Sequence, residues 1–385
     1  MPNLLVVSED RIHRGPDGHY YAEGAGGYET WERLFASFDR VTLCVRSRDV
    51  SGVRPGVVRV EGPQLRVAPL PYYVGPRHFL PLRARIRELI AAEIPRHDAL
   101  LARMPGILSY QLVTLARRTG RGYGLEVVGD PIDVFSGHSS NHPLRAVFRA
   151  LFAWQLRDAA RGARGVVYVS GGPMRARYQT DAPWEVASDV NLPDEAYAAA
   201  PRTHSSGPHG IALIGSLDQP YKGVHVLLRA YSKLPAVLRA RTMLHFIGGG
   251  RLQSDYKALA EELGVATSVE WHGVLASGAS VREALDAATL YVQPSSVEGL
   301  PRATLEAAAR GLPAIGTRVG GIPEIVPEEA IIEIGDVDAL AQTIERVLQD
   351  PVAYDRLAAR CYDTAKGYHR DILMRTRARI YRTWW

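Results

Sequence analysis

The sequence predicts an α/β protein built from two doubly wound domains that face a cleft. Short apolar runs typical of buried strands alternate with amphipathic helical patterns twice along the 385 residues. The segment 198–210, AAAPRTHSSGPHG, is small, polar and proline-rich, as linkers are, and it separates the two series. Because each half is long enough to bury its own core, we expect domains at 1–200 and 205–364.

The composition is that of a soluble globular enzyme, with 46% hydrophobic and 23% charged residues. Cys44 and Cys361 lie far apart and form neither a disulfide framework nor a zinc-binding spacing, which fits a reducing cytosol. The first apolar run, 4–7, is too short for a signal peptide or a membrane span. The net charge of +5 is modest and no nucleic-acid motif accompanies it, so we expect a cytoplasmic protein that binds no nucleic acid.

A glycine-rich loop stands near the start of the first domain. The pattern around it predicts a strand, the loop, a helix and a second strand, in order at 3–8, 24–27, 28–38 and 41–45. Such a loop suits a dinucleotide, but its glycines begin well after the strand, and Glu29 occupies a position that requires glycine or alanine. Two uses stay open: Gly26 and Gly27 let the backbone approach a ligand, or the loop is simply flexible.

Two later strands of this domain, 99–102 and 124–128, end beside charged residues. Ligands of open parallel sheets gather at the carboxyl ends of the strands. Arg103 follows the first strand and is a candidate for contact with phosphate or an acceptor, and Asp130 follows the second and is a candidate for a hydroxyl. Turn chemistry with a surface charge is the alternative for each.

The segment 142–164 predicts a basic amphipathic helix. It is followed by a strand at 166–170 and a helix at 174–178. Basic amphipathic helices lie on anionic membranes, but they also pack their apolar side on a sheet, and both alternatives stay open. Its charged residues are five arginines and one aspartate: Arg145, Arg149, Arg157, Arg161, Arg164 and Asp158.

The second domain opens with a strand at 211–214 and a loop at 215–223 that holds Ser216 and Lys222. An amphipathic helix follows, with Val224, Leu227, Leu228 and Tyr231 on one face. Strands at 244–247 and 269–271 and a helix at 281–287 continue the alternation. Asp336 and Asp338 precede another helix, where capping explains them better than a metal ion does.

The stretch 290–326 carries the strongest chemical signal. After a strand at 290–292, a helix begins at Pro301 and ends at Gly311, the usual positions of these two residues. The backbone N–H groups at the start of a helix suit phosphates and sugar hydroxyls, and Glu298 lies beside them as an acceptor. Glu306 lies in the helix among apolar neighbours, where a carboxylate requires a hydroxyl or a cation.

These features resemble the signature of the retaining nucleotide-sugar glycosyltransferases of the GT-B fold, family 4, also called glycosyl transferase group 1. The motif Glu-(seven residues)-Glu is here Glu298 and Glu306, and the turn 320–324, GGIPE, matches as well. The resemblance implies two Rossmann-like domains around a central cleft. The domain at 1–200 would be the acceptor side, completed by the C-terminal helix at about 365–385, and the domain at 205–364 would bind the donor.

The resemblance also implies site residues. Glu298 and the segment Gly299, Leu300 and Pro301 would hold donor-sugar hydroxyls, and Glu306 would hold the ribose. Lys222 would bind the diphosphate, but Ser216 stands where the family has an arginine, so Arg251 or Arg302 is the candidate replacement. The implied catalytic set is Lys222, Glu298 and Asp130, although the family often has a histidine close to Asp130. Gly26 and Gly27 would approach the donor diphosphate.

The implied reaction is transfer of a hexosyl group from a UDP- or GDP-type sugar to an acceptor hydroxyl, with retention and without a metal or other cofactor. Biosynthesis of cell-surface polysaccharide, glycolipid or a natural-product glycoside would be its setting. The partners are the nucleotide sugar and the hydroxyl acceptor, and contact with the inner face of the membrane through 142–164 stays open. The rivals are a nucleotide-sugar epimerase or hydrolase on the same fold, and a non-catalytic donor-binding homologue.

Overall fold

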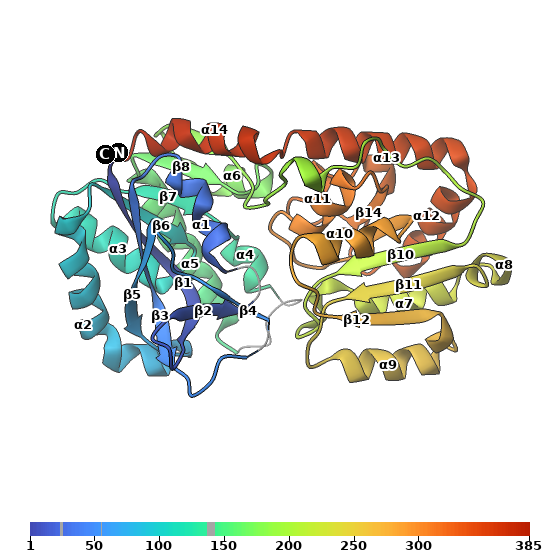
Figure 1. Ribbon diagram of the computed structural model, residues 1–385, viewed down its shortest axis with the longest axis horizontal. Helices are drawn as coiled ribbons and strands as arrows, with labels where there is room; N and C mark the ends of the chain where they lie inside the picture. Colours follow the sequence, from blue (N-terminus) through green and yellow to red (C-terminus); the bar gives the residue numbers. More distant parts are fainter. Residues whose placement is uncertain (24–25, 55, 137–142) are drawn as a thin grey trace.

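The computed structural model describes residues 1–23, 26–54, 56–136 and 143–385, and it forms two lobes side by side (Figure 1). Each lobe is a mainly parallel sheet with helices packed against it, which confirms the predicted α/β class with two doubly wound halves. In the second lobe every described strand pairing is parallel. Parallel pairing requires a crossover between strands, and the helices supply it.

In the first sheet the strand order is β5-β3-β1-β6-β7-β8-β9; in addition, β2 pairs antiparallel with β1, and β4 pairs antiparallel with β2. The strands are β1 Asn3–Arg14, β2 Tyr20–Glu23, β3 Arg40–Asp49, β4 Val57–Arg59, β5 Leu65–Pro71, β6 Ala99–Met104, β7 Gly124–Val127, β8 Gly165–Tyr168 and β9 Trp184–Val186. The helices are α1 Tyr28–Phe35, α2 Gly75–Glu93, α3 Ile107–Arg118, α4 Pro131–Val134, α5 Arg145–Arg161 and α6 Pro173–Arg177.

In the second sheet the strand order is β12-β11-β10-β13-β14-β15. The strands are β10 His209–Ile214, β11 Thr242–Ile247, β12 Val269–Gly273, β13 Leu290–Gln293, β14 Ala314–Thr317 and β15 Ile331–Ile332. The helices of this half are α7 Val224–Ser232, α8 Ala236–Arg239, α9 Gln253–Glu262, α10 Ala279–Asp286, α11 Arg302–Ala309, α12 Val337–Gln349 and α13 Pro351–Lys366, and the last helix of the chain is α14 Arg370–Tyr381. The order reverses between β10 and β13, so their carboxyl ends flank the crevice where open α/β sheets bind ligands.

Some predicted bounds differ from the structure. β1 runs to Arg14 instead of residue 8, because after a register shift between Val7 and Arg11 it continues to pair with β3 and takes up β2. The helix expected at 28–38 ends at Phe35. The helix expected at 142–164 is α5, Arg145–Arg161, and residue 142 lies outside the described residues.

The segment predicted as a linker is held against the second domain. The backbone N–H groups of Ala198 and Arg202 donate to the carbonyl oxygens of Ala309 and Gly311, both at 2.9 Å. The Arg202 guanidinium also donates to Asp286, at 3.1 Å. The composition of 198–210 correctly predicted a connection between the two domains. The hydrogen bonds of Ala198 and Arg202 fix the course of this connection along the second domain.

The C-terminal helices cross from one domain to the other (Figure 1). α13 packs on α11 of the second domain, and after a break at Gly367, α14 packs on β8 and β9 of the first. A buried charge cluster anchors α14: Arg377 pairs with Asp189 at 3.1 Å, and the Tyr381 hydroxyl donates to Glu126 at 2.8 Å. The last helix is therefore part of the first domain's structure.

Trp384, just after α14, provides a test of this anchoring. Its side chain is buried, with the indole N–H donating to the Gly165 carbonyl oxygen, whereas Trp385 is 42% exposed. Trp384→Ala should lower the free energy of unfolding of the first domain by about 3–5 kcal/mol, because it removes a large packed ring. Trp385→Ala is the matched control and should cost much less. Chemical denaturation followed by far-UV circular dichroism measures both, and equal losses would contradict the anchoring role.

Candidate functional site

Four loops of the second domain meet at the carboxyl edge of its sheet. They follow the neighbouring strands β11, β10, β13 and β14 and comprise residues 248–251, 215–223, 294–301 and 318–324. Ser296 N–H donates to the Tyr221 carbonyl oxygen at 2.8 Å, which joins the loops after β10 and β13. The sheet order thus brings together segments that are distant in the sequence.

Glycines allow these loops to approach one another closely. Gly223 has a φ of +75°, and a Cβ there would lie 2.1 Å from the Pro294 carbonyl oxygen. Gly320 has a φ of +54°, and a Cβ would lie 2.1 Å from the carbonyl oxygen of Glu298. Both positions require glycine because of the left-handed backbone and the lack of space. Gly320 of the predicted turn therefore allows the loop after β14 to lie against the backbone of Glu298.

Lys222 and Glu298 form an ion pair at the centre of this edge. Lys222 Nζ donates to Glu298 Oε1 at 2.6 Å, and the side chains are 17% and 8% exposed. The same oxygen accepts from Ser295 Oγ at 2.7 Å and from Gln293 Nε2 at 3.2 Å. No partner among the described residues is found for Glu298 Oε2. One carboxylate oxygen thus fixes the lysine, and the other is available to a hydroxyl.

The residues behind Glu298 form a continuous polar chain. The Tyr291 hydroxyl donates to Gln293 Oε1, and Gln293 Nε2 donates in turn to Ser295 Oγ at 2.7 Å. All three residues are buried. Sequence reasoning did not single out Gln293 or Ser295, although two polar residues directly after a buried strand were the available signal.

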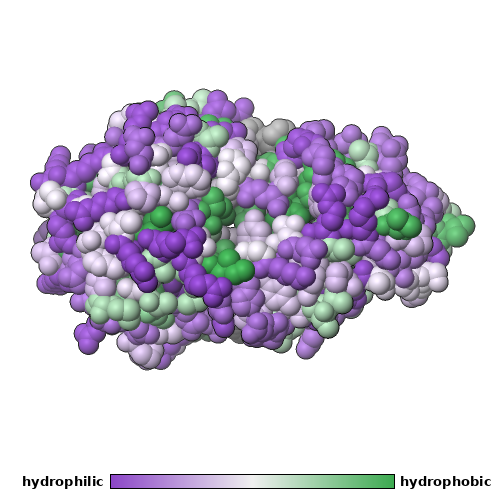
Figure 2. Space-filling model, turned by 90° about the horizontal axis from the view of Figure 1, so that it is seen from above, coloured by the Kyte–Doolittle hydropathy of each residue, from purple (hydrophilic) through white to green (hydrophobic). Residues whose placement is uncertain are grey.

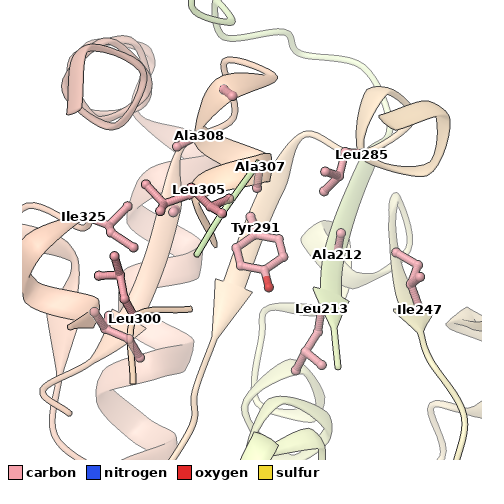
Figure 3. Close-up of a cluster of buried hydrophobic side chains, with 14 of the residues drawn as sticks. Ala212, Leu213, Ile247, Leu285, Tyr291, Leu300, Leu305, Ala307, Ala308 and Ile325 are labelled. Atoms are coloured by element: carbon pink, nitrogen blue, oxygen red, sulfur yellow. The ribbon is translucent and has the colours of Figure 1, made fainter. Parts of the chain in front are cut away.

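Glu306 lies in α11 on the same edge. Burial raises its carboxyl pKa above the ordinary value of 4.5, and Arg302 and Arg282 offset part of this rise. Within the described part of the chain, no hydrogen-bond or ion-pair partner is found for its carboxylate. Figure 3 shows the apolar side of the same helix, where Leu305 and Ala308 pack toward Ile325. The side chain is partly buried, and its carboxylate has no protein partner among the described residues, which favours a ligand.

The loop that holds Lys222 also holds Ser216 and Asp218, and Arg251 of the loop after β11 contacts Asp218. Ser216 Oγ and Asp218 Oδ2 are 3.0 Å apart, and Arg251 Nε donates to the Asp218 carbonyl oxygen at 2.7 Å. Arg251 N–H also donates to Asp218 Oδ1 at 3.0 Å. The structure thus brings Arg251 to the loop in which Ser216 occupies the expected arginine position. No comparable contact joins Arg302 to this loop in the described residues.

The first domain contacts the same edge from across the cleft. Glu324, the last residue of the GGIPE turn, accepts from Ser170 Oγ at 2.9 Å and from the N–H groups of Gly171 and Gly172 at 3.1 and 2.8 Å. Ser170 to Gly172 follow β8, so the carboxyl edges of both sheets face each other. The sequence pattern could not reveal this contact, because its partners are far apart in the chain.

Asp130 is engaged within its own domain. Oδ1 accepts from the Ile132 N–H at 2.8 Å and from the Tyr178 hydroxyl, and Oδ2 pairs with Arg177. The carboxylate is buried and caps α4. Turn chemistry, the alternative weighed for Asp130, describes this geometry better than contact with an acceptor hydroxyl.

Arg103 is likewise occupied by carboxylates. Its Nε donates to Glu126 at 3.1 Å, and its Nη2 pairs with Asp189. Arg33 joins the same buried cluster through Glu126, at 3.1 Å. Arg103 therefore helps to hold the carboxyl end of β6, and its charge is largely matched by acids of its own domain.

Gly26 and Gly27 lie at the start of α1. A Cβ on Gly27 would lie 2.7 Å from the Val58 side chain, and one on Gly26 would lie 2.8 Å from the Ala22 side chain. Close packing of this turn on β2 and β4 explains both glycines. Residues 24–25 of the same predicted loop lie outside the described residues.

Asp336 behaves as predicted. Its Oδ1 accepts from the Ala339 N–H at 2.9 Å at the start of α12, which confirms that it caps the helix.

Comparison with known proteins points to one family. The family model described as glycosyl transferases group 1 matches residues 204–367, which contain all four loops. Protein CapJ of Staphylococcus aureus is 24% identical over 89% of this chain and 85% of that protein. The lipopolysaccharide core biosynthesis glycosyltransferase LpsE of Rhizobium meliloti is 32% identical over 150 residues. The matched part is 38% of this chain and 42% of that protein.

Solved structures show the same fold. The crystal structure of Alr3699/HepE of Anabaena, in complex with UDP-glucose, superposes with a TM-score of 0.67 over 98% of this chain and 99% of that one, at 16% identity. At this level of identity the likeness concerns the arrangement of the two domains. That arrangement is the GT-B fold expected from the motif.

Glu306→Gln should change stability in a pH-dependent way. A carboxyl whose pKa is raised by folding is favourable when protonated, and its contribution is lost as the pH rises from about 4.5 through the raised pKa. The ligand-free variant should therefore gain in Tm relative to the unchanged protein between about pH 4 and 7, since glutamine stays neutral. Scanning fluorimetry across this range measures the difference. Glu262→Gln on exposed α9 is the control, and a Glu306→Gln difference that is flat with pH would contradict the burial argument.

Proposed function

We propose that this chain, whose residues 204–367 match the family model of glycosyl transferases group 1, moves a hexosyl group from a nucleoside diphosphate sugar to an acceptor hydroxyl with retention at the anomeric carbon. The observation that carries the proposal is the Lys222–Glu298 pair, with one Glu298 oxygen engaged and the other available. It lies where the strand order of the second sheet reverses, as ligand sites of open α/β sheets do.

Lys222 serves the departing diphosphate in this proposal. As the bond between the anomeric carbon and the phosphate oxygen breaks, negative charge grows on the diphosphate, and a preorganised ammonium stabilises it. The acceptor oxygen forms the new bond to the anomeric carbon on the same face, and its proton passes to the leaving phosphate. No protein nucleophile or metal ion takes part. Glu298 orients Lys222 through Oε1 and accepts a sugar hydroxyl at Oε2.

The nucleotide would extend from this point along the sheet edge. Glu306, whose partly buried carboxylate has no partner among the described residues, would accept the ribose hydroxyls and gain the partners that it lacks. Arg251, beside Ser216, would supply the second positive charge for the diphosphate. The backbone N–H groups of Gly299 and Leu300, just before α11, would be donors to the sugar.

Epimerase or hydrolase activity is the rival on the same fold. Either reaction requires a free general acid and base near the anomeric carbon. Asp130, the candidate across the cleft, has both oxygens occupied by Ile132, Tyr178 and Arg177, which favours transfer. Incubation of the donor without acceptor tests this: a transferase leaves the sugar largely intact, whereas free or epimerised sugar at the rate of full turnover would support the rival.

An anionic membrane surface is the proposed place of the acceptor, and α5 is the proposed contact. This helix buries Ala153, Leu156 and Ala160 against its own domain. A second apolar stripe, Val147, Leu151 and Trp154, remains exposed beside exposed arginines. On the face of the molecule seen in Figure 2, apolar residues form small groups among hydrophilic ones. No described helix has the length and apolar character that a membrane crossing requires, so the contact would be peripheral.

The first test of the reaction is Lys222→Ala. With the donor saturating, kcat should fall by roughly a hundredfold or more, because the lost charge acts chiefly on the transition state. Lys222→Gln, which keeps a hydrogen-bond donor without the charge, should recover little. Arg229→Ala, on the solvent face of α7, is the control for loss of one positive charge in this domain.

Arg251 and Ser216 complete that test. Arg251→Ala should weaken donor binding, and Ser216→Arg should restore part of kcat in a Lys222→Ala background, because it returns a cation to the loop. Near-normal kcat for folded Lys222→Ala would show that another residue carries the diphosphate charge. Steady-state kinetics with a panel of nucleotide sugars provides the measurement.

The membrane contact predicts co-sedimentation with anionic vesicles. Binding should fall when the exposed stripe is replaced by serine, because its burial in the interface is lost, and it should weaken at high salt. The test variant replaces Val147, Leu151 and Trp154. The control variant makes the same change at exposed apolar residues of other helices, namely Leu80, Val237 and Val352. Equal binding by both variants would refute a role of α5.

A further inference from the structure

Three potential metal ligands meet at the edge of the second sheet, and none of them belongs to the proposed donor site. His245 lies on β11, and Glu270 and His272 lie on the neighbouring edge strand β12. Their ligand atoms all lie within 4.8 Å of one another. This is the one such group of three found among the described residues.

Strand pairing explains why the three side chains share one face. His245 lies opposite Glu270 in the parallel ladder, and Phe246 lies opposite Trp271. Neighbouring positions in register point to the same side of a sheet, and successive residues alternate. Phe246 and Trp271 stack on the opposite face, with ring centroids 4.8 Å apart. The histidine and glutamate side chains are therefore directed away from that aromatic pair.

A β-bulge adds the third ligand. Trp271 pairs with Phe246, but the next pair joins Gly273 to Ile247, so His272 is the extra residue on β12. Gly273 follows with a φ of +68°, which glycine adopts at no steric cost. Bulges redirect side chains, and here the rings of His272 and His245 come to a centroid distance of 5.3 Å.

The distances fit a tetrahedral ion. His245 Nδ1 lies 3.1 Å from His272 Nε2 and 3.2 Å from Glu270 Oε2, and His272 Nε2 lies 3.8 Å from that oxygen. With metal–ligand bonds of about 2.0–2.1 Å, tetrahedral geometry separates ligand atoms by about 3.4 Å. The measured separations lie on both sides of this value. We propose that His245, Glu270 and His272 bind a divalent transition metal ion of the Zn²⁺ class, with solvent as the fourth ligand.

The ligand types support this class of ion. Imidazole nitrogens with one carboxylate suit zinc and its neighbours, whereas magnesium and calcium prefer oxygen ligands alone. The Glu270 side chain is 57% exposed and leaves an entry path from solvent, while His245 is largely buried. Edge strands also carry charged side chains simply to prevent pairing with other chains, and this alternative predicts no stoichiometric binding.

A metal ion bound at this site would also stabilise the start of the loop after β11. Gly248 N–H donates to the Gly273 carbonyl oxygen at 2.7 Å, directly beyond the bulge, and the loop then reaches Arg251. A bound ion would tie the end of β12 to β11 below this loop. Its role in this position is structural and does not depend on the proposed transfer reaction.

The test uses the full chain after treatment with a chelator and its removal. Zn²⁺ is titrated in competition with a chromogenic chelator, and Co²⁺ is titrated separately, with visible absorption as the report of four-coordinate geometry. We expect one equivalent of either ion and a rise in Tm with Zn²⁺. Affinity should fall at least tenfold in Glu270→Gln and further in His245→Ala and His272→Ala, because each removes a ligand.

His19→Ala is the matched control. His19 lies 3.5 Å from Glu61, so it offers a histidine–carboxylate pair without a third ligand, and its loss should leave zinc affinity unchanged. Should His245→Ala fail to fold, Glu270→Gln decides the matter, because its side chain is exposed. The proposal would be overturned if the unchanged protein did not bind Zn²⁺ stoichiometrically. It would also be overturned if folded Glu270→Gln and His272→Ala bound Zn²⁺ as tightly as the unchanged protein.

Discussion

The contact between Lys222 and Glu298 is the interaction on which the site depends. It joins the loops after β10 and β13, the two strands between which the order of the second sheet reverses. A solvent-exposed ion pair of this length would contribute at most about 1 kcal/mol, but a largely buried charge that loses its partner costs about 3–5 kcal/mol. Because both side chains are mostly buried, removal of either one would leave the other as a largely buried charge without its partner.

Burial of charge also holds the first domain and its C-terminal helix together. Arg33, Arg103 and Arg377 surround Asp189 and Glu126, and their positive charges keep the pKa of both carboxyl groups below the ordinary range despite burial. The acids therefore stay ionised, and each arginine contacts at least one of the two carboxylates. Arg377 comes from α14, so the crossing helix is fixed by charge as well as by packing.

The side chain of Glu324 joins the carboxyl edges of the two sheets. Glu324 accepts three hydrogen bonds from 170–172 and thereby holds the GGIPE turn against the first domain. In the same turn Gly320 allows the backbone to lie on Glu298. A single loop thus contacts both the backbone of Glu298 and the first domain.

The sequence by itself determined the two α/β halves, the helix after Pro301 and the cap at Asp336. It also identified Glu298 and Glu306 as candidate site residues. All of these depend on local pattern and spacing. The sequence determined neither the role of Arg103 and Asp130 nor the grouping of His245, Glu270 and His272. Arg103 lies near the carboxyl end of β6 and Asp130 follows β7, but their partners Asp189 and Tyr178 are remote in the chain. The histidine pair requires a ladder register and a bulge. Only the tertiary structure decides such contacts, since strand order and register bring side chains together independently of their separation in the sequence.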